Sequence, residues 1–231
     1  MKKVLSILLC IALLIGMTAC GSDKENDKKG TTESKVTENN SETSQKTEDA
    51  TNGSKTLVVY FSMPETTDPE NMNEDEENSA IVVNGEVLGN TQYAAYLIQE
   101  HTGAEIFRIE PKTPYTTDHE KLVDIASEEQ EENARPEMKA NVENIDQYDT
   151  IFIGYPIWWH TTPKVIDTFL EKYNLKGKTI IPFCTSGGSD IEEAMPAIND
   201  LCKGSTILEG YTADDGTTTE IREWLKQIGQ L

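Results

Sequence analysis

The sequence predicts an α/β fold, in which one parallel sheet of five strands lies between two layers of helices. Five short apolar runs alternate with segments of helical periodicity along residues 56–231, and this alternation favours parallel strands joined by right-handed crossovers. Three of the runs are apolar at consecutive positions, as expected for strands covered on both faces. Five strands and five helices fit a three-layer, doubly wound sheet with the strand order 2-1-3-4-5.

The predicted strands differ in how deeply they should be buried. The second run contains Ile106 and Ile109 among alternating residues, which indicates a strand nearer the edge of the sheet. The five runs are TLVVYF (56–61), AEIFRIEP (104–111), TIFIGY (150–155), TIIPFCT (179–185) and STILEGYT (205–212).

Each predicted helix has an apolar face at helical spacing. The helix that starts at Pro163 carries proline in its first turn, where the missing N–H is not needed. The helix after Asp118 has Leu122, Ile125 and Ala126 inside and acidic residues outside. The five predicted helices span residues 90–102, 118–134, 163–173, 190–201 and 217–228.

An insertion separates the first strand from the first helix, where a compact α/β unit would have a tight turn. Its first half is acidic and contains prolines, so we expect it to be exposed; the insertion spans residues 63–87. Its second half, which begins AIVV at residue 80, is typical of a hairpin that turns at Asn84 and Gly85.

The N-terminus has the pattern of a signal peptide. Lys2 and Lys3 precede the apolar run 4–17, and small residues then precede Cys20. The run is shorter than the roughly 20 apolar residues that a membrane span needs. A cysteine at this place resembles a bacterial lipobox, which implies cleavage after residue 19, a lipid on Cys20 and anchorage at the outer face of the cell membrane. The alternative is an ordinary secretory signal with an incidental cysteine.

Residues 20–55 are predicted to be a disordered tether, and residues 56–231 the folded domain. The tether is rich in Ser, Thr, Asn, Glu and Lys, and its eight acidic and six basic residues nearly balance. The domain has 33 acidic and 12 basic residues, which equals the chain's formal net charge of −21. This charge argues against nucleic acid or anionic lipid as a partner of the domain. The negative charge of the domain either keeps it soluble or provides a docking surface for a basic partner.

The cysteines and histidines give no sign of a metal site. Cys184 and Cys202 remain after the signal and the lipid are accounted for, and we expect both to be small buried hydrophobes. Outside the cytoplasm these two cysteines are able to form a disulfide, but their spacing does not indicate one. No metal-binding motif is present.

The predicted topology directs attention to the loops after the first, third and fourth strands, because ligands of doubly wound sheets bind there. The loop TSGGSD (185–190) can expose backbone N–H groups to a ligand, or it is a plain turn with Ser189 as helix cap. The loop PIWWH (156–160) offers aromatic walls. In the other interpretation, one tryptophan caps the core and the second is half-exposed.

The insertion divides the loop after the first strand into two parts, which we call its two lips. Ser62 lies on one lip, and Gly89, Asn90 and Thr91 lie on the other. Glycine allows close backbone approach, and the start of the helix offers N–H donors to a phosphate. The alternative is a helix cap beside a surface insertion.

Three stretches together resemble bacterial flavodoxin-like proteins that bind FMN: VVYFS with GNTQYAAYLI, YDTIFIGYPIWWHTTPKVIDTFLE, and GKTIIPFCTSGGSDIEEAMPAI. The resemblance covers residues 56–231 and implies a flavodoxin-like fold and bound FMN. Carried over by position, it implies phosphate contacts from Ser62, Asn90, Thr91 and Gln92. It implies that Pro156, Ile157, Trp158 and Trp159 flank the flavin ring on one side, with His160 nearby. It implies that Thr185, Ser186, Gly187, Gly188 and Ser189 meet the polar edge of the ring.

The chain departs from that pattern at three places. The insertion breaks the compact phosphate loop, His160 stands where glycine is frequent, and Asp190 adds a charge after the paired glycines. None of these departures removes the expectation of FMN, and each bears on the redox potential or on the choice of partner.

The function predicted from these features is electron transfer outside the cytoplasm. The protein would be a one-electron carrier for a redox protein partner, or an NAD(P)H-dependent reductase of a small quinone-like acceptor. In either case the flavin supplies the chemistry, and no catalytic acid or base is assigned. The alternative from another class is a non-redox binding lipoprotein that kept the fold without flavin.

Overall fold

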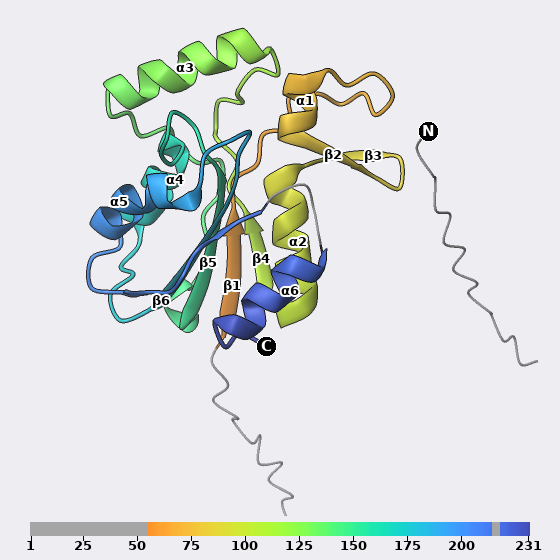
Figure 1. Ribbon diagram of the computed structural model, residues 1–231. Coiled ribbons are helices and arrows are strands. Elements are labelled where there is room, and N and C mark those ends of the chain that lie inside the picture. Colours follow the sequence, from red (N-terminus) through yellow and green to blue (C-terminus); the bar gives the residue numbers. More distant parts are fainter. Residues whose placement is uncertain (1–54, 214–217) are drawn as a thin grey trace, which may run out of the picture. The chain divides into compact units, whose positions relative to one another are not determined.

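The computed structural model describes residues 55–213 and 218–231 (Figure 1). The predicted signal peptide, the lipidation site Cys20 and the tether up to residue 54 lie outside the described residues. Within the described ranges, no helix combines the length and the apolar character needed to cross a bilayer.

The main sheet confirms the predicted fold class and strand order. Its strands are parallel and follow the order β4-β1-β5-β6-β7, with β8 also paired to β6. In sequence numbering this is the order 2-1-3-4-5. The strands are β1 (Thr56–Tyr60), β4 (Glu105–Arg108), β5 (Thr150–Pro156), β6 (Thr179–Thr185), β7 (Thr206–Ile207) and β8 (Tyr211–Thr212).

The fifth predicted strand is interrupted, and Pro182 on the neighbouring strand explains why. The carbonyl oxygen of Ile180 accepts from Leu208 N (3.0 Å), and that of Cys184 accepts from Ala213 N (2.7 Å). Pro182 stands between these acceptors on the same edge of β6 and has no N–H to donate. The fifth strand therefore bulges away opposite the proline and returns as β8.

Two helices cover each face of the sheet. On one face α2 and α6 pack against a core that includes Val58 and Phe152. On the other face α4 and α5 pack against a core that includes Val59 and Ile151. These helices lie within a few residues of the predicted ranges: α2 (Asn90–Thr102), α4 (Lys164–Lys172), α5 (Ile191–Leu201) and α6 (Thr218–Gln227).

The helix α3 (His119–Glu131) occupies a different position. Its buried residues Leu122 and Ala126 belong to neither core. Figure 1 shows α3 beyond the carboxyl ends of the strands, at the same end of the sheet as α1. Its apolar stripe therefore faces the end of the sheet where the ligand loops gather.

The insertion contains the predicted hairpin and one helix that the sequence analysis did not predict. The strands β2 (Ala80–Val83) and β3 (Glu86–Gly89) pair antiparallel, and Asn84 and Gly85 have φ angles of 53° and 85°, as a tight type I′ turn requires. The acidic half was expected to be plain exposed loop. It includes α1 (Glu74–Ser79), which is capped by Asn73. A short 3₁₀ turn, Ile145–Gln147, was also not predicted.

Candidate functional site

A cavity of about 540 Å³ opens at the carboxyl ends of β1, β5 and β6. This is the position that the topology of a doubly wound sheet assigns to a ligand. Twelve of the fourteen predicted site residues line it: Ser62, Thr91, Pro156, Ile157, Trp158, Trp159, His160, Thr185, Ser186, Gly187, Gly188 and Ser189. The other two predicted residues, Asn90 and Gln92, do not line it.

The two lips of the interrupted loop meet in the structure. The β2–β3 hairpin pairs Ala80 with Gly89, and the backbone N–H of Gln92 donates to Ser62 Oγ at 3.2 Å. A Cβ at Gly89 would lie 2.0 Å from Ser62 Oγ, so the backbone approaches that hydroxyl too closely for any side chain. The insertion thus leaves and re-enters the fold at nearly the same point.

Asn90 and Gln92 have structural partners. The Asn90 side chain donates to the carbonyl oxygen of Asn78 at 2.9 Å and so ties α2 to the last turn of α1. The Gln92 side chain donates to the Tyr96 hydroxyl at 2.8 Å. Neither residue lines the main cavity, and both amide nitrogens are engaged by these partners. The start of α2 still offers its free backbone N–H groups to a ligand.

Thr91 connects two of the ligand loops. Its hydroxyl shares a hydrogen bond of 2.7 Å with the Thr185 hydroxyl, and both side chains are buried. The helix itself does not use the backbone N–H groups of Asn90 and Thr91. This end of the cavity therefore combines hydroxyls with N–H donors at a helix start.

The two tryptophans stand on a tight turn. The backbones of Trp158 and Thr161 exchange hydrogen bonds of 3.0 and 3.1 Å, which leaves Trp159 and His160 at the tip. Both tip residues have left-handed backbone, with φ angles of 50° and 62°, a conformation that costs energy for side chains of this size. The turn therefore needs other contacts to hold it.

Those contacts come from helices on both sides of the cavity. The indole N–H of Trp159 donates to the carbonyl oxygen of Val123 on α3 at 3.1 Å, although the side chain is 53% exposed. The His160 Nδ1 pairs with the Glu193 carboxylate on α5, and this hydrogen bond lowers the pKa of Glu193. His160, which the resemblance placed near the ring, therefore has a carboxylate partner on α5.

Trp158 points the other way and packs in an aromatic cluster. Its ring meets Phe61 and Tyr115 edge-on, with centroid separations of 5.4 and 5.2 Å. The Tyr115 hydroxyl donates to Glu129 on α3 at 2.8 Å. Burial raises the pKa of Glu129, and Tyr115 partly offsets this through its hydrogen bond.

The glycine loop is ordered by Ser186. Its Oγ accepts from the backbone N–H groups of Gly188 (3.1 Å) and Ser189 (2.7 Å). The N-cap of the following helix is Asp190, whose N–H donates to Glu193 at 3.4 Å, rather than Ser189 as one interpretation had it. Two N–H groups of this loop are thus already used within the protein.

Nine further residues that line the cavity were not predicted from the sequence. They come from the insertion and from α3, and together we call them the second wall: Met63, Glu65, Asp75, Asn78, Ser79, His119, Leu122, Val123 and Ala126. The apolar stripe of α3 was recognised, but it was expected to face the sheet. The periodicity could not predict that α3 lies over the cavity, because it shows which face of a helix is apolar but not what that face packs against.

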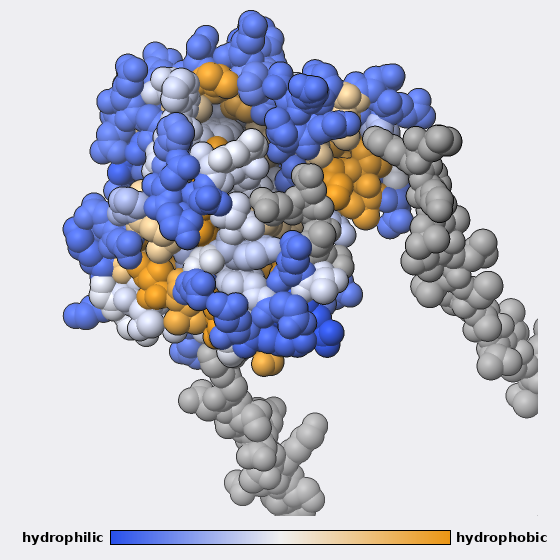
Figure 2. All heavy atoms as spheres, in the orientation of Figure 1, coloured by the Kyte–Doolittle hydropathy of each residue, from blue (hydrophilic) through white to orange (hydrophobic). Residues whose placement is uncertain are grey.

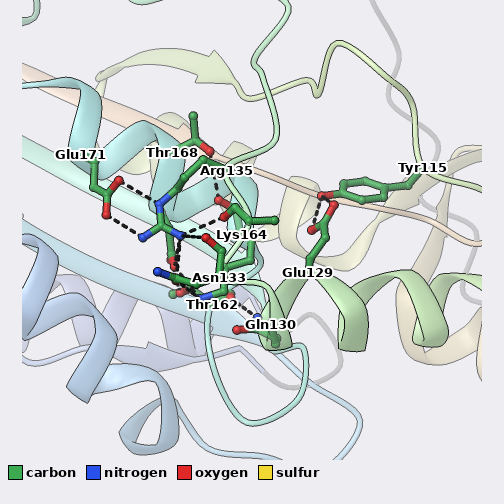
Figure 3. Close-up of polar contacts among 11 residues, drawn as sticks. Tyr115, Glu129, Gln130, Asn133, Arg135, Thr162, Lys164, Thr168 and Glu171 are labelled. Carbon is green, nitrogen blue, oxygen red and sulfur yellow. Dashed lines mark hydrogen bonds and ion pairs between the residues drawn. The ribbon is translucent and has the colours of Figure 1, made fainter.

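A polar network holds the far end of α3 against α4 (Figure 3). Gln130 donates to the carbonyl oxygen of Thr162 at 2.9 Å. Arg135 binds both carboxylate oxygens of Glu171, at 2.6 and 2.8 Å. The buried Asp167 accepts from Thr162 Oγ1 at 2.6 Å and from Lys164 at 2.9 Å. Since Thr162 directly follows the tryptophan turn, the same network fixes both this turn and α3.

A family model described as flavodoxin matches residues 79–228. The chain belongs to the flavodoxin family. The matched part contains both loops after β5 and β6 and begins inside the insertion, which places the first half of the insertion outside what the family model covers.

Solved structures of similar proteins agree with this membership. A candidate flavoprotein from Bacteroides eggerthii is 34% identical, with a TM-score of 0.60 over 76% of this chain and 98% of its own. Another from Bacteroides uniformis is 30% identical, with a TM-score of 0.60 over 75% and 99%. A Lactobacillus acidophilus flavoprotein in complex with FMN is 24% identical, with a TM-score of 0.54 over 74% and 98%, and shows the shared fold. No curated protein matches this flavodoxin.

Proposed function

We propose that this flavodoxin binds FMN and transfers electrons outside the cytoplasm. It would act as a one-electron carrier or as an NAD(P)H-dependent reductase of a quinone-type acceptor. The observation that carries the proposal is the cavity at the carboxyl edge of the sheet, which brings the tryptophan turn, the glycine loop and the start of α2 together. FMN is the cofactor, as in the Lactobacillus acidophilus relative.

The residues present fit the phosphate end of FMN. At Gly89 the backbone lies so close to Ser62 that it leaves no room for a Cβ, and the adjacent start of α2 offers N–H donors with the positive end of the helix dipole. The described residues that line the cavity include no Lys or Arg. The phosphate would therefore be held by hydroxyls of Ser62 and Thr91 and by backbone N–H groups.

The remaining loops fit the ring. Trp158 and Trp159 offer apolar surface on one side, and the loop Thr185–Ser189 offers backbone polar groups on the other. When bound, FMN supplies one- and two-electron redox chemistry. The protein positions the ring, restricts water and adds the negative charge of Glu65 and Asp75 at the cavity, which should lower the reduction potential.

The cellular location is part of the proposal and rests on the N-terminal sequence. The charged start, the apolar run and Cys20 support export followed by lipid attachment. The protein would then be held at the outer face of the cell membrane through the lipid on Cys20, with residues 21–55 between the lipid and the domain.

The experiment that tests the cofactor is reconstitution. The purified full chain, incubated with FMN and desalted, should retain about one flavin per chain and show its yellow absorption. Absence of bound FMN after reconstitution would refute the proposal and favour the non-redox binding lipoprotein. Oxidation of NADH or NADPH in the presence of a quinone would then separate the reductase from the carrier, since a carrier shows no such turnover.

A further inference from the structure

The second wall gives the cavity a side that the three ligand loops do not account for. Its residues come from the loop after β1, from α1 and from α3. Asn78 of α1 also lies close to the glycine loop, because a Cβ added at Gly187 would stand 3.5 Å from its side-chain nitrogen. The cavity is therefore bounded by the insertion as well as by the sheet.

Three of the four α3 residues in the wall are apolar; the fourth is His119. Leu122, Val123 and Ala126 follow one another at helical spacing and all line the cavity. The exposed Trp159 is attached to the same helix through the carbonyl oxygen of Val123. The apolar strip and the tryptophan turn therefore meet along one side of the cavity, while the visible outer surface around α3 is mainly hydrophilic (Figure 2).

The insertion part of the wall carries negative charge. Glu65 pairs with His119 at 2.7 Å, and the Glu65 side chain is only 11% exposed. Asp75 lies close enough to act on the same imidazole and helps to raise its pKa. Even when His119 is protonated, two carboxylates face one cation. The other lining histidine, His160, is paired with a carboxylate of its own.

We infer that the second wall and the tryptophan turn form a substrate compartment for a planar aromatic acceptor that is neutral or cationic. This inference rests on the proposed function, because the compartment adjoins the loops assigned to the flavin. A planar ring would contact the apolar strip Leu122–Val123–Ala126, with the exposed Trp159 at the border of the strip. An anionic ring would meet the carboxylates of Glu65 and Asp75 with no lining Lys or Arg to offset them.

The same charges bear on the electron donor. A nicotinamide dinucleotide carries phosphates, and anion sites in proteins use Arg, Lys or free backbone N–H groups. The second wall offers none of these cationic side chains. The carboxylates of Glu65 and Asp75 therefore disfavour the phosphates of a dinucleotide in this compartment, which suits the acceptor better than the donor.

A matched pair of ligands tests the inference on the full chain loaded with FMN. Naphthoquinone is neutral, and its ring-sulfonated analogue has the same ring with one negative charge. In calorimetric titrations of the oxidised protein, naphthoquinone should bind saturably, and the sulfonate should bind about tenfold or more weakly. Higher salt should narrow the gap by screening the carboxylates, a measurement that needs no variant.

Two variants of α1 test whether a cavity carboxylate causes the weaker binding of the sulfonate. Asp75→Asn removes a cavity carboxylate, so the sulfonate should gain affinity by several-fold while naphthoquinone changes little. Glu74→Gln is the control, since it makes the same change of charge on α1 at a residue that does not line the cavity. Bound FMN, read from its absorption, shows that each variant is folded.

The outcomes separate the two proposals. If the chain holds FMN but binds neither ligand, or binds both equally, the compartment is refuted and the FMN proposal stands. If Asp75→Asn and Glu74→Gln have the same effect, the charge of the second wall is not the discriminating feature, and the inference is also wrong. If the chain holds no FMN, both proposals fail.

Discussion

At the scale of single residues, Trp158 and Trp159 are neighbours in sequence with different surroundings. Trp158 is partly buried against Phe61 and Tyr115, whereas Trp159 is 53% exposed and held by one hydrogen bond to α3. One ring supports the fold around the cavity, and the other is available to a ligand. The sequence predicted such a division without saying which ring had which part, because both follow the same strand.

Alanine substitutions should separate these two parts. Trp158→Ala should lower the free energy of unfolding by about 2–4 kcal/mol, because a packed aromatic ring is removed. Trp159→Ala should cost less than about 1 kcal/mol, since its ring is half in water, and yet weaken FMN binding. Urea unfolding and FMN titration measure the two effects. Negligible and equal changes in FMN affinity would contradict a role of the turn in holding the ring.

His119 gives a second prediction at this scale. Its hydrogen bond to Glu65 raises its pKa above the ordinary value of 6.5. The pair therefore stabilises the folded state fully below pH 6.5, and this contribution is lost as the pH rises through the folded pKa. NMR titration of the full chain should show the raised pKa, and Glu65→Gln should return it toward 6.5.

The control for this titration is Glu70→Gln, which removes an exposed carboxylate from the same segment. It should leave the pKa of His119 nearly unchanged. The contribution to stability is small, because His119 is 46% exposed and its pair is screened by solvent. An equal shift in both variants would mean that general charge, and not the contact with Glu65, sets the pKa.

At the scale of elements, polar contacts connect the C-terminal end of α3 and the segment after it to the region of α4. Asp167 on α4 is 3% exposed and accepts from Thr162 and Lys164, with Arg135 at 3.8 Å. A buried carboxylate with these partners holds the segment that joins the tryptophan turn to α4. The geometry of the cavity thus depends on a residue that does not line it.

Asp167→Ala should therefore destabilise the domain by about 3 kcal/mol, because it leaves buried donors without an acceptor. Glu171→Ala is the matched control on the same helix. It removes a carboxylate that also binds Arg135 but whose side chain is 45% exposed, and it should cost less than about 1 kcal/mol. Urea unfolding followed by tryptophan fluorescence compares them. Equal losses of unfolding free energy in the two variants would show that the buried contacts of Asp167 stabilise the domain no more than the exposed contact of Glu171.

The elements also show what the sequence could and could not predict. The hairpin was predictable because Asn84 and Gly85 specify a tight turn. The helix α1 was missed because it has no buried residue and hence no apolar period. Its signal was the capping box of Asn73 and Glu76, which is short and easily overlooked in an acidic segment. The break in the last strand was missed because its cause, Pro182, lies on another strand.

At the scale of the whole molecule, the order of the sheet and the place of the site followed from the sequence. Alternating strands and helices allow few topologies, and the loops at the carboxyl edge then carry the predicted residues. What did not follow was the second wall, since it depends on where α3 and the insertion settle relative to that edge. Such placement is decided by tertiary contacts between residues far apart in the chain, such as Glu65 with His119.

Because the insertion begins and ends at adjacent points of the fold, it behaves as an exchangeable module. The Ser62 hydroxyl and the Gln92 N–H lie one hydrogen bond apart, so changes of length between Ser62 and Gly89 need not disturb the sheet. Substitutions in this segment would reshape one side of the cavity while the tryptophan turn and the glycine loop stay in place.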